Sequence, residues 1–512
     1  MALVQGAKGW WKATIGLEIH CQIKSVTKLF SKAPLPLLKS HQNSCVSLFD
    51  AATPGTLPVL NEECVRQALT AVLALNCEVN RVSHFERKHY YYQDLPLGYQ
   101  ITQQDRPIGG SGFLEFYTNA RDKNNKNAVP QKVGITRVQM EQDSGKSLHD
   151  RLADTTCVDL NRAGQGLLEI VFEPDLHSAA EAASVVKTMQ QLVRHIGVCD
   201  ANMEDGSLRV DVNVSVATAG QRGPDSIVGN RVEVKNLNSV QRIMAAIDHE
   251  VHRQVSILQE EGGRIEMETR GFDATTGSTH RLRSKETAVD YRFMPDPDLP
   301  PLELDDDFVA SVQAALPETP EATAERLVAT MGLTEEQIQL LMAQESVFYF
   351  DAVLATDSAL DPIKAFFWVT TVLQGHLKAA GLEIKEGHVS AHDAAAMLAK
   401  LADGSLTPVQ GRDVLVELCL KENRCRALAD VLAEQGLDLQ GEAGNSGLST
   451  ADLTDLCEQV VSAEENRKQV AKYKAGKKGV LKYFVGEVMR ATRGVADPKD
   501  TEAVMARVLD AT

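Results

Sequence analysis

The sequence predicts an α+β protein, in which a region of mixed strands and helices precedes regions made of helices alone. Four segments within the first 300 residues alternate apolar and polar residues with a period of two, as half-buried strands do. Beyond residue 300 the pattern is almost wholly helical and rich in Ala, Leu and Glu. A chain of 512 residues has room for about two to four domains. We place three of them at 1–300, 301–405 and 406–512.

The four predicted strands cover residues 15–23, 134–141, 208–216 and 231–235. Each strand turns its apolar residues to one side and its polar residues to the other. In the last strand, Val232 and Val234 are expected to be buried and the polar residues that alternate with them to be exposed. The polar sides carry Glu18 and His20, then Arg137 and Glu141, then Arg209 and Asp211, and finally Arg231, Glu233 and Lys235.

Three helices in this region have clear start signals. The first follows Asn61, the second opens with the capping box Ser178-Ala-Ala-Glu181 and stops at Gly197, and the third begins near Ser239. The Pro-rich acidic passage that starts at Met294 is the strongest linker candidate, because proline continues neither regular element. A Gly-rich break at 441–447 interrupts the later helices.

Composition excludes several classes of protein. No run of 18 apolar residues exists, so no membrane-spanning helix is expected. The net charge of −17 divides into −3 for residues 1–300 (33 basic, 36 acidic) and −14 for the remainder (20 basic, 34 acidic), which argues against coating of nucleic acid by a basic surface. Nine scattered cysteines without a CxxC pair indicate a reducing compartment. Residues 1–12 are too short for a secretory signal and at most a fragment of an organelle address.

The polar strand faces predict a cation site if the four strands share one sheet. Glu18, Glu141, Asp211 and Glu233 would then converge beside His20, and uncompensated carboxylates repel each other. Mg²⁺ takes oxygen ligands and shares its shell with nucleotide phosphates, although one imidazole among carboxylates also suits Mn²⁺ or Zn²⁺. A sheet that simply exposes a charged face to water is the alternative.

Other motifs are incomplete or ambiguous. Gly145-Lys146-Ser147 resembles the end of a P-loop but lacks the earlier glycine, and no Gly-x-Ser-x-Gly elbow or Rossmann glycine motif is present. Residues 467–482 contain seven basic residues and no acid, Lys472, Lys474, Lys477 and Lys478 among them. Such a strip suits the phosphates of a nucleic acid, or it is a solvated helix face.

Many ordered motifs resemble one family. They include Gly16-Leu17-Glu18-Ile19-His20, residues 50–58, Arg87-Lys88-His89-Tyr90-Tyr91-Tyr92, Tyr99-Gln100-Ile101-Thr102-Gln103, residues 141–147, 159–164 and 206–211, Glu233-Val234-Lys235-Asn236, and Asp290-Tyr291-Arg292-Phe293-Met294-Pro295. Across essentially the whole chain they resemble the B subunit of the glutamyl-tRNA(Gln)/aspartyl-tRNA(Asn) amidotransferase, the GatB family. The resemblance is to the B type, because the E type carries an inserted domain for which this chain has no room.

The resemblance implies a glutamine-synthetase-like catalytic domain with an antiparallel sheet, then a helical domain and a helical tail that grips tRNA. It implies an ATP- and Mg²⁺-dependent carbon–nitrogen ligase that phosphorylates the side-chain carboxylate of Glu-tRNA(Gln), and of Asp-tRNA(Asn) in some members. Ammonia, released from glutamine by the A subunit in a complex with a small C subunit, then replaces the phosphate.

The resemblance also assigns roles to residues. The metal ligands it implies are Glu18, His20, Glu141, Asp211 and Glu233, whose four carboxylates are catalytic. The charge pattern, independently of the resemblance, makes Arg137, Arg209 and Lys235 candidates for phosphate contacts, and the four lysines of the basic strip candidates for tRNA contacts. Gln142 and Ser144 replace the Glu and Ala usual in bacterial members, which favours the mitochondrial matrix over a plastid or the bacterial cytoplasm.

Two rival functions stay open. The chain could be a tRNA-holding scaffold without catalytic activity, whose charged sheet face is merely solvated. It could also be a metal-dependent phosphohydrolase that does not use tRNA.

Overall fold

The computed structural model divides the chain into two compact units, Met1–Thr323 and Ala324–Thr512, each of which is described by itself. The described residues are 3–7, 9–37, 40–118, 130–150, 154–220, 227–284, 291–384, 388–419, 426–435, 437, 450–475, 477–492, 496 and 498–511.

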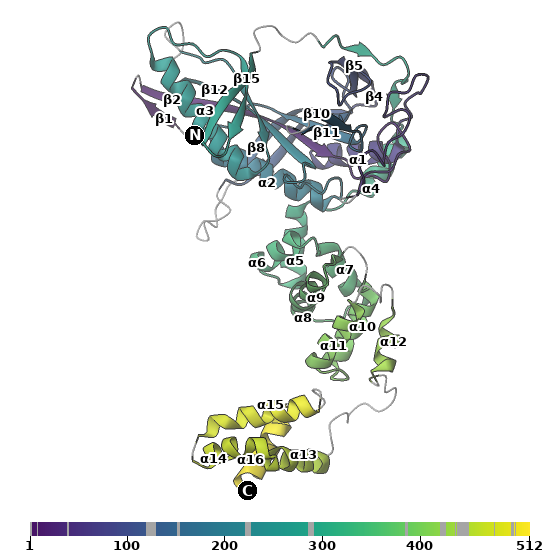
Figure 1. The fold of residues 1–512 in the computed structure, drawn as a ribbon, viewed down its shortest axis with the longest axis vertical. Coiled ribbons are helices and arrows are strands. Elements are labelled where there is room, and N and C mark those ends of the chain that lie inside the picture. Colours follow the sequence, from purple (N-terminus) through teal and green to yellow (C-terminus); the bar gives the residue numbers. More distant parts are fainter. Residues whose placement is uncertain are drawn as a thin grey trace. The chain divides into compact units, whose positions relative to one another are not determined.

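A ten-stranded sheet organises the first unit (Figure 1). Its order is β15-β14-β13-β12-β2-β11-β8-β7-β3, with β1 also paired to β2. The strands are β1 (Leu3–Gly6), β2 (Gly9–Gln22), β3 (Glu78–Val79), β7 (Gly109–Phe116), β8 (Gln131–Gln142), β11 (Gly166–Phe172), β12 (Leu208–Thr218), β13 (Val232–Leu237), β14 (Glu268–Asp273) and β15 (Ser278–Ser284). The pairs are antiparallel except β13–β14, which is parallel because a helix between them returns the chain across the sheet. The mixed α+β class is therefore confirmed.

All four predicted strands lie in this sheet, where they overlap β2, β8, β12 and β13; the predicted strands 15–23 and 231–235 each extend one residue beyond the observed strand. β2 is flanked by β12, where Asp211 stands opposite Glu18, and by β11, where Glu169 stands opposite His20. β11 in turn joins β2 to β8. One expectation was wrong: Glu233 is buried, because β14 lies beside β13 and Thr269 of β14 packs against its carboxylate.

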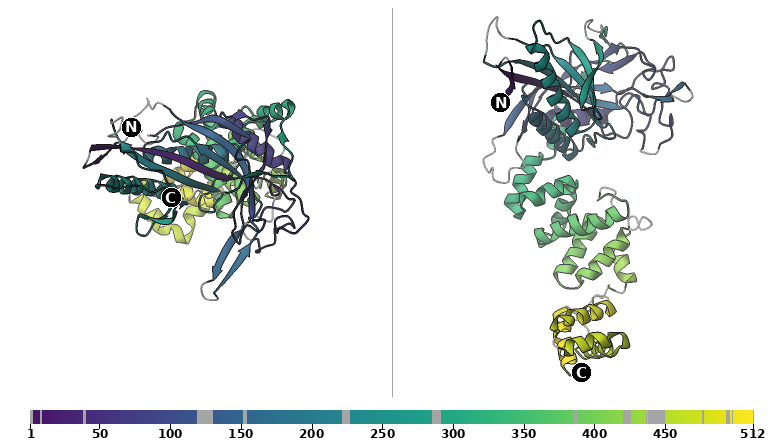
Figure 2. Two further views of the ribbon diagram at one scale, coloured as in Figure 1. Left: turned by 90° about the horizontal axis from the view of Figure 1, so that it is seen from above. Right: turned by 60° about the vertical axis from the view of Figure 1, so that its left-hand side comes forward.

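The three predicted helices are confirmed as α1 (Glu62–Ala74), α2 (Ala179–His195) and α3 (Val240–Gln259). Each begins with the expected capping residue: the side chains of Asn61, Ser178 and Ser239 accept hydrogen bonds from backbone amides of the first turn. The predicted capping box of α2 is half formed, because the Glu181 carboxylate accepts from the amide of His177 and not from that of Ser178. α2 and α3 lie side by side against one face of the sheet (Figures 1 and 2). Their apolar residues join those of β2 and β12 in one hydrophobic core, so the polar residues of these strands face the other way.

The Pro-rich passage near residue 294 is not a free linker. β16 (Met294–Pro295) joins β5 (Glu86–His89) and β6 (Tyr99–Thr102) in a small sheet, and β17 (Leu302–Glu303) pairs with β4 (Val82–Ser83). The guanidinium of Arg87 binds the buried carboxylate of Asp296 at 2.9 Å. Proline is tolerated here because these two-residue strands lie at sheet edges. β9 (Lys146–Asp150) and β10 (Thr155–Asp159) form a separate hairpin, and α4 (Asp306–Ala314) also adds apolar residues to the first core.

The described elements after β17 are helices, as predicted. They comprise α5 (Pro320–Met331), α6 (Glu335–Ala343), α7 (Val347–Thr356), α8 (Pro362–Phe367), η1 (Trp368–Leu373), α9 (Gln374–Ala379), α10 (Ala391–Ala402), α11 (Pro408–Leu418), α12 (Leu428–Glu434), α13 (Thr450–Ser462), η4 (Glu464–Asn466), α14 (Arg467–Lys474), η5 (Lys478–Val480), α15 (Leu481–Ala491) and α16 (Pro498–Ala511).

Two hydrophobic clusters hold these helices together, one running in sequence from Leu327 to Leu432 and the other from Leu453 to Leu509. The predicted Gly-rich break at 441–447 lies outside the described residues, and the three-domain division at 300 and 405 stays a prediction. Among the described residues no helix is long and apolar enough to cross a bilayer.

Candidate active site

The candidate site lies on the polar face of the sheet around β2. Side chains two residues apart on a strand share a face, so Glu18 and His20 both point away from the helix-covered core. The structure groups the five predicted ligands into two neighbouring clusters and adds a sixth residue, Glu169. We call His20, Glu141 and Glu169 the imidazole cluster, and Glu18, Asp211 and Glu233 the carboxylate cluster.

In the imidazole cluster the three potential ligand atoms all lie within 4.8 Å of one another. His20 Nδ1 lies 3.1 Å from Glu141 Oε1, and Glu169 Oε2 accepts a hydrogen bond of 2.7 Å from Gln139. Glu141 and Glu169 are buried, whereas His20 is half-buried. Three groups with lone pairs thus converge from three adjacent strands.

Burial, hydrogen bonds and neighbouring charges all shift the pKa values of this cluster. Burial alone lowers the pKa of His20, but the hydrogen bond to Glu141 and the surrounding negative charges raise it to about 9. Burial works against ionisation of Glu141, yet the bond to His20 holds its pKa below the usual value. Burial and the charge of Glu141 raise the pKa of Glu169 to about 7. Without a further cation, the cluster therefore stores a proton on the imidazole.

In the carboxylate cluster the three acids also offer oxygens within 4.8 Å of one another. Lys235 donates to Asp211 at 2.6 Å and lies 3.3 Å from Glu233. Asn213 donates to Glu18 at 3.0 Å and Thr269 donates to Glu233 at 2.8 Å. Burial opposes the charge of Lys235, but Asp211 and Glu233 raise its pKa above the usual value. Each carboxylate is thus held by a neighbouring strand.

The two clusters contain more negative than positive charge. They hold five carboxylates, and among the described residues His20 and Lys235 are the cationic groups at ion-pair distance. A cation that binds between such carboxylates removes their repulsion. An all-oxygen set such as the carboxylate cluster suits Mg²⁺, while the imidazole cluster also fits Mn²⁺ or Zn²⁺. The donor chemistry therefore fits the predicted divalent cations.

The predicted phosphate-binding residues differ in their partners. Arg209 Nη1 and Nη2 bind both carboxylate oxygens of Asp143, at 3.2 and 2.6 Å. Burial opposes the charge of Arg209, but Asp143 raises its pKa further above the usual value. Arg137 instead bonds to the neutral amides of Gln139 and Gln104. Arg137 is therefore better placed than Arg209 to offer uncompensated charge to an anion.

Glu169 is the site residue that the strand analysis missed. Its strand, Gly166–Phe172, is apolar apart from this one carboxylate, so it does not alternate and reads as fully buried. A lone buried acid in an apolar strand is itself a signal, since burying a charge without a partner is costly.

The four lysines of the basic strip lie in the second unit. Lys472 and Lys474 occupy the last turn of α14, and Lys477 and Lys478 follow it; all four are exposed. The ammonium of Lys478 lies 5.2 Å from the centre of the Tyr473 ring. The strip is accessible to a polyanion, but exposure alone also fits a solvated surface.

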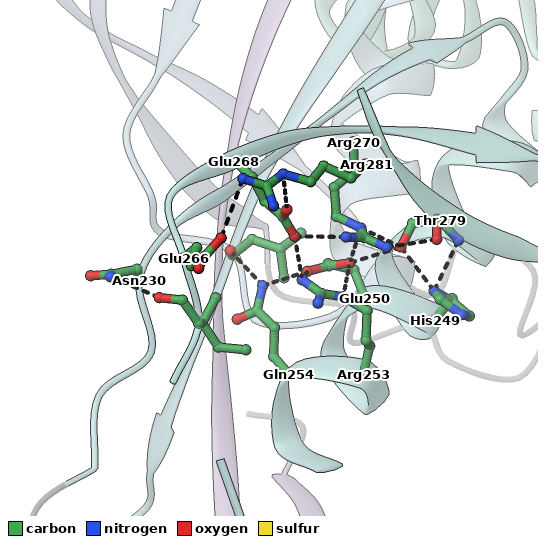
Figure 3. A network of polar contacts seen from close by, with 12 residues as sticks. Asn230, His249, Glu250, Arg253, Gln254, Glu266, Glu268, Arg270, Thr279 and Arg281 are labelled. Carbon is green, nitrogen blue, oxygen red and sulfur yellow. Dashed lines mark hydrogen bonds and ion pairs between the residues drawn. The ribbon is translucent and has the colours of Figure 1, made fainter. Parts of the chain in front are cut away.

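A contrasting group of buried charges lies beneath β14 and β15, which we call the Glu250 network (Figure 3). Glu250 of α3 is fully buried and accepts two hydrogen bonds from Arg253, of 2.9 and 2.6 Å. Arg270 Nη1 donates to Glu268 at 2.6 Å, and Arg281 lies 3.3 Å from Glu268 and from Glu266. Three carboxylates here meet three guanidinium groups; Glu250 and Glu268 are buried, whereas Glu266 and Arg281 lie at the exposed end of the network.

Comparison with known proteins agrees with this architecture. The GatB/GatE catalytic domain model matches residues 13–310, and the GatB domain model matches residues 349–509. The chain belongs to the GatB family. The first of these matches contains both acid clusters, and the second contains the basic strip.

Full-length relatives in the GatB family share about two-fifths of their residues with this chain. The mitochondrial B subunit of the glutamyl-tRNA(Gln) amidotransferase of Phytophthora infestans is 39% identical over 100% of this chain and 97% of its own length. The B subunit of the aspartyl/glutamyl-tRNA(Asn/Gln) amidotransferase of Zymomonas mobilis is 39% identical over 99% of both chains. The Rhizobium etli protein of the same name is 41% identical over 98% of this chain and 96% of its own.

Proposed function

We propose that this chain is the B subunit of a glutamine-dependent tRNA amidotransferase, and that its sheet face carries the ATP-dependent step. The substrate would be Glu-tRNA(Gln), with Asp-tRNA(Asn) as a second substrate that the names of relatives include. The reaction class would be an ATP-dependent carbon–nitrogen ligase that uses glutamine as the amide donor. The observation that carries the proposal is the excess of carboxylates over cations among the described residues of the two acid clusters, where Glu141, Glu169 and Glu233 are buried.

The chemistry explains why such a site is needed. A free carboxylate is a poor acyl donor, because an oxide would have to leave. Transfer of the γ-phosphoryl group of ATP to a carboxylate oxygen forms an acyl phosphate and releases ADP. Ammonia then attacks the carbonyl carbon, phosphate leaves, and the nitrogen loses a proton to give the amide. Divalent cations supply charge neutralisation between the anionic carboxylate and the anionic triphosphate.

The chain's own residues would divide the work. Glu18, Asp211 and Glu233, together with His20, Glu141 and Glu169, would hold the cations through their oxygen and nitrogen atoms. Arg137 and Lys235 would orient the phosphates, since both are half-buried and cationic. Arg209 stays a candidate for a phosphate contact. Its guanidinium would bind a phosphate while Asp143 holds the plane of the group in place.

The remaining assignments extend the same proposal. The A subunit would release the ammonia, the small C subunit would complete the complex, and Lys472, Lys474, Lys477 and Lys478 would bind tRNA phosphates. We also propose a glutamine-synthetase-like arrangement for the catalytic domain at 1–300, followed by helical domains at 301–405 and 406–512. The mitochondrial matrix is our preferred location, with a plastid or the bacterial cytoplasm as alternatives, since one full-length relative is mitochondrial.

The test is Glu233→Gln in the assembled complex. We expect transamidation to fall by about 100-fold or more, the scale of losing one group that stabilises transition-state charge. Glutaminase activity and tRNA binding should remain. Glu115→Gln is the matched control, because Glu115 is an exposed carboxylate on β7 of the same sheet. Normal amidation by Glu233→Gln would refute the catalytic assignment and leave the tRNA-holding scaffold.

The same preparation separates the third hypothesis. A metal-dependent phosphohydrolase would hydrolyse ATP at the same rate with and without misacylated tRNA. The proposed ligase should consume ATP in proportion to the amide that it forms. Turnover that ignores the charged tRNA would therefore favour the phosphohydrolase.

A further inference from the structure

Beside the two acid clusters the chain exposes a group of aromatic rings that the reaction itself does not use. We call Tyr90, Tyr91, Tyr92, Tyr291 and Phe293 the aromatic platform. Tyr91 is 83% exposed, Tyr92 62% and Phe293 41%. Large aromatic side chains usually bury most of their surface, so several exposed rings together indicate a surface that binds something.

The platform is built from two chain segments far apart in the sequence. β5 and β16 pair directly, and the amide of His89 donates to the carbonyl of Tyr291 at 2.8 Å. The rings then meet edge to face, with centroids 5.8 Å apart for Tyr90 and Tyr92 and 6.3 Å for Tyr90 and Tyr291. Such edge contacts support the rings and leave other ring faces open.

Backbone geometry fixes the second segment. Arg292, between Tyr291 and Phe293, adopts a φ of +45°, which is unfavourable for a side chain of this size. Its carbonyl lies 2.9 Å from Nδ1 of His89, a contact that helps to hold this conformation. Tyr291 and Phe293 remain in edge contact at 6.1 Å. Strained residues of this kind tend to occur where the structure serves binding.

Positive charge lies among the rings. The ammonium of Lys88 is 4.9 Å from the centre of the Tyr291 ring and 6.0 Å from that of Tyr90. Arg292 is exposed beside them. Cations next to exposed aromatic rings are the combination that suits single-stranded nucleic acids, because bases stack on the rings and phosphates pair with the charges.

The platform also adjoins the candidate active site. The Tyr90 hydroxyl donates to Gln100, whose amide donates to the carbonyl of Gln142, the residue after Glu141. Two hydrogen bonds therefore connect Tyr90 to the residue that follows Glu141, while Tyr91 and Tyr92 lie exposed to solvent.

We propose that the aromatic platform stacks the unpaired nucleotides at the 3′ end of the tRNA and so delivers the aminoacyl group to the acid clusters. This inference rests on the proposed function. We favour the tRNA end over the adenine of ATP because the outer rings form an open surface. A small ligand needs a concave site, whereas a tRNA gains affinity from its other contacts as well.

The experiment uses the assembled complex with Tyr91→Ala and Tyr92→Ala combined. We expect the KM for misacylated tRNA to rise by about 10-fold or more, since stacking of one base is worth roughly that much or more. The KM for ATP should stay unchanged. Tyr91→Phe and Tyr92→Phe keep both rings and should retain most of the affinity. Tyr117→Ala removes an exposed tyrosine outside the platform and serves as the control.

A binding measurement keeps this test independent of catalysis. Intact tRNA and tRNA trimmed of its unpaired 3′ nucleotides are compared by fluorescence anisotropy on wild-type and double-alanine complexes. The alanine variant should weaken binding of intact tRNA and leave trimmed tRNA unaffected. Equal binding of intact tRNA by both complexes, or a raised KM for ATP alone, would overturn the proposal. A complex that binds as expected but never transamidates would instead count against the proposed function.

Discussion

The acid clusters and the Glu250 network lie on opposite faces of the same sheet, and their carboxylates are balanced by cations to different extents. Consecutive residues of β14 serve both: Thr269 donates to Glu233 in the carboxylate cluster, while Glu268 and Arg270 point into the network. In the network three carboxylates meet three guanidinium groups. In the clusters five carboxylates meet His20 and Lys235 among the described residues.

This balance of charges separates structural from functional carboxylates. Buried carboxylates that are fully matched by arginines need nothing more, and they hold secondary-structure elements together. Buried carboxylates in excess are costly unless another cation arrives. The second arrangement is expected where a metal ion and a phosphate take part in the chemistry.

The two groups of charges should differ most in how much they contribute to the free energy of unfolding. Glu250→Ala leaves Arg253 and Arg270 without their shared, fully buried partner, so we expect a loss of about 3–5 kcal/mol in the free energy of unfolding of the first unit. Glu169→Gln, in the imidazole cluster, should cost little without added metal, because it removes one of the mutually repelling charges. Urea unfolding of both variants measures the difference.

The exposed pair of Glu62 and Arg66 supplies the reference for an ordinary surface interaction. Glu62→Ala should lower the free energy of unfolding by less than about 1 kcal/mol. If Glu250→Ala were no more destabilising than this control, the network would not be the structural support that we describe.

A smaller effect is expected at Thr269, which links the two regions. Thr269→Val removes the hydroxyl that donates to Glu233 at 2.8 Å while keeping the shape of the side chain. Loss of a residue that orients a metal ligand typically weakens metal affinity or activity about 10- to 100-fold. We expect that range for Mg²⁺-dependent transamidation, measured against Mg²⁺ concentration.

Thr279→Val is the matched control, because the Thr279 hydroxyl donates to Glu250 at 3.1 Å on the other face. This variant should lose stability and keep its Mg²⁺ dependence. Equal behaviour of the two valine variants would mean that the faces of β14 are not functionally separate.

The sequence predicts the framework of the site well, and the reason is periodicity. Alternation along residues 15–23 and 208–216 places Glu18, His20 and Asp211 on one face, and the sheet brings these side chains together. Capping residues such as Ser178 predict helix starts because their effect is local. Patterns of this kind depend only on near neighbours in the chain.

Features that depend on distant partners could not be predicted in this way. Glu233 is buried because β14, some 35 residues later, lies beside it, and Glu169 gives no alternation signal within its apolar strand. The sequence of the Pro-rich passage predicts a linker, because the ion pair between Arg87 and Asp296 that anchors it depends on a residue far away in the chain. The pairing of Arg209 with Asp143 also joins separate strands and loops.

The smallest difference that we expect concerns the pH dependence of one histidine from each region. His20, among excess carboxylates, has its pKa raised to about 9, whereas burial, together with Arg253 and Arg270, lowers the pKa of His249 below its usual 6.5. Without metal, His20 should therefore contribute stability that is complete below about pH 6.5 and lost as the pH rises through 9. The contribution of His249 to stability should be complete above pH 6.5, and it should be lost as the pH falls through the lowered pKa of this residue.

NMR of protein with ¹³C-labelled histidines measures both titrations, with His20→Gln and His249→Gln variants to assign the signals. Added Mg²⁺ or Mn²⁺ should lower the apparent pKa of His20, because a metal requires a neutral imidazole and competes with its proton. The same ion should leave His249 unchanged, since that residue lies beside arginines on the other face. A His20 that titrates at or below 6.5 in the metal-free protein would show that the carboxylates do not create the negative field on which the proposed cation sites depend.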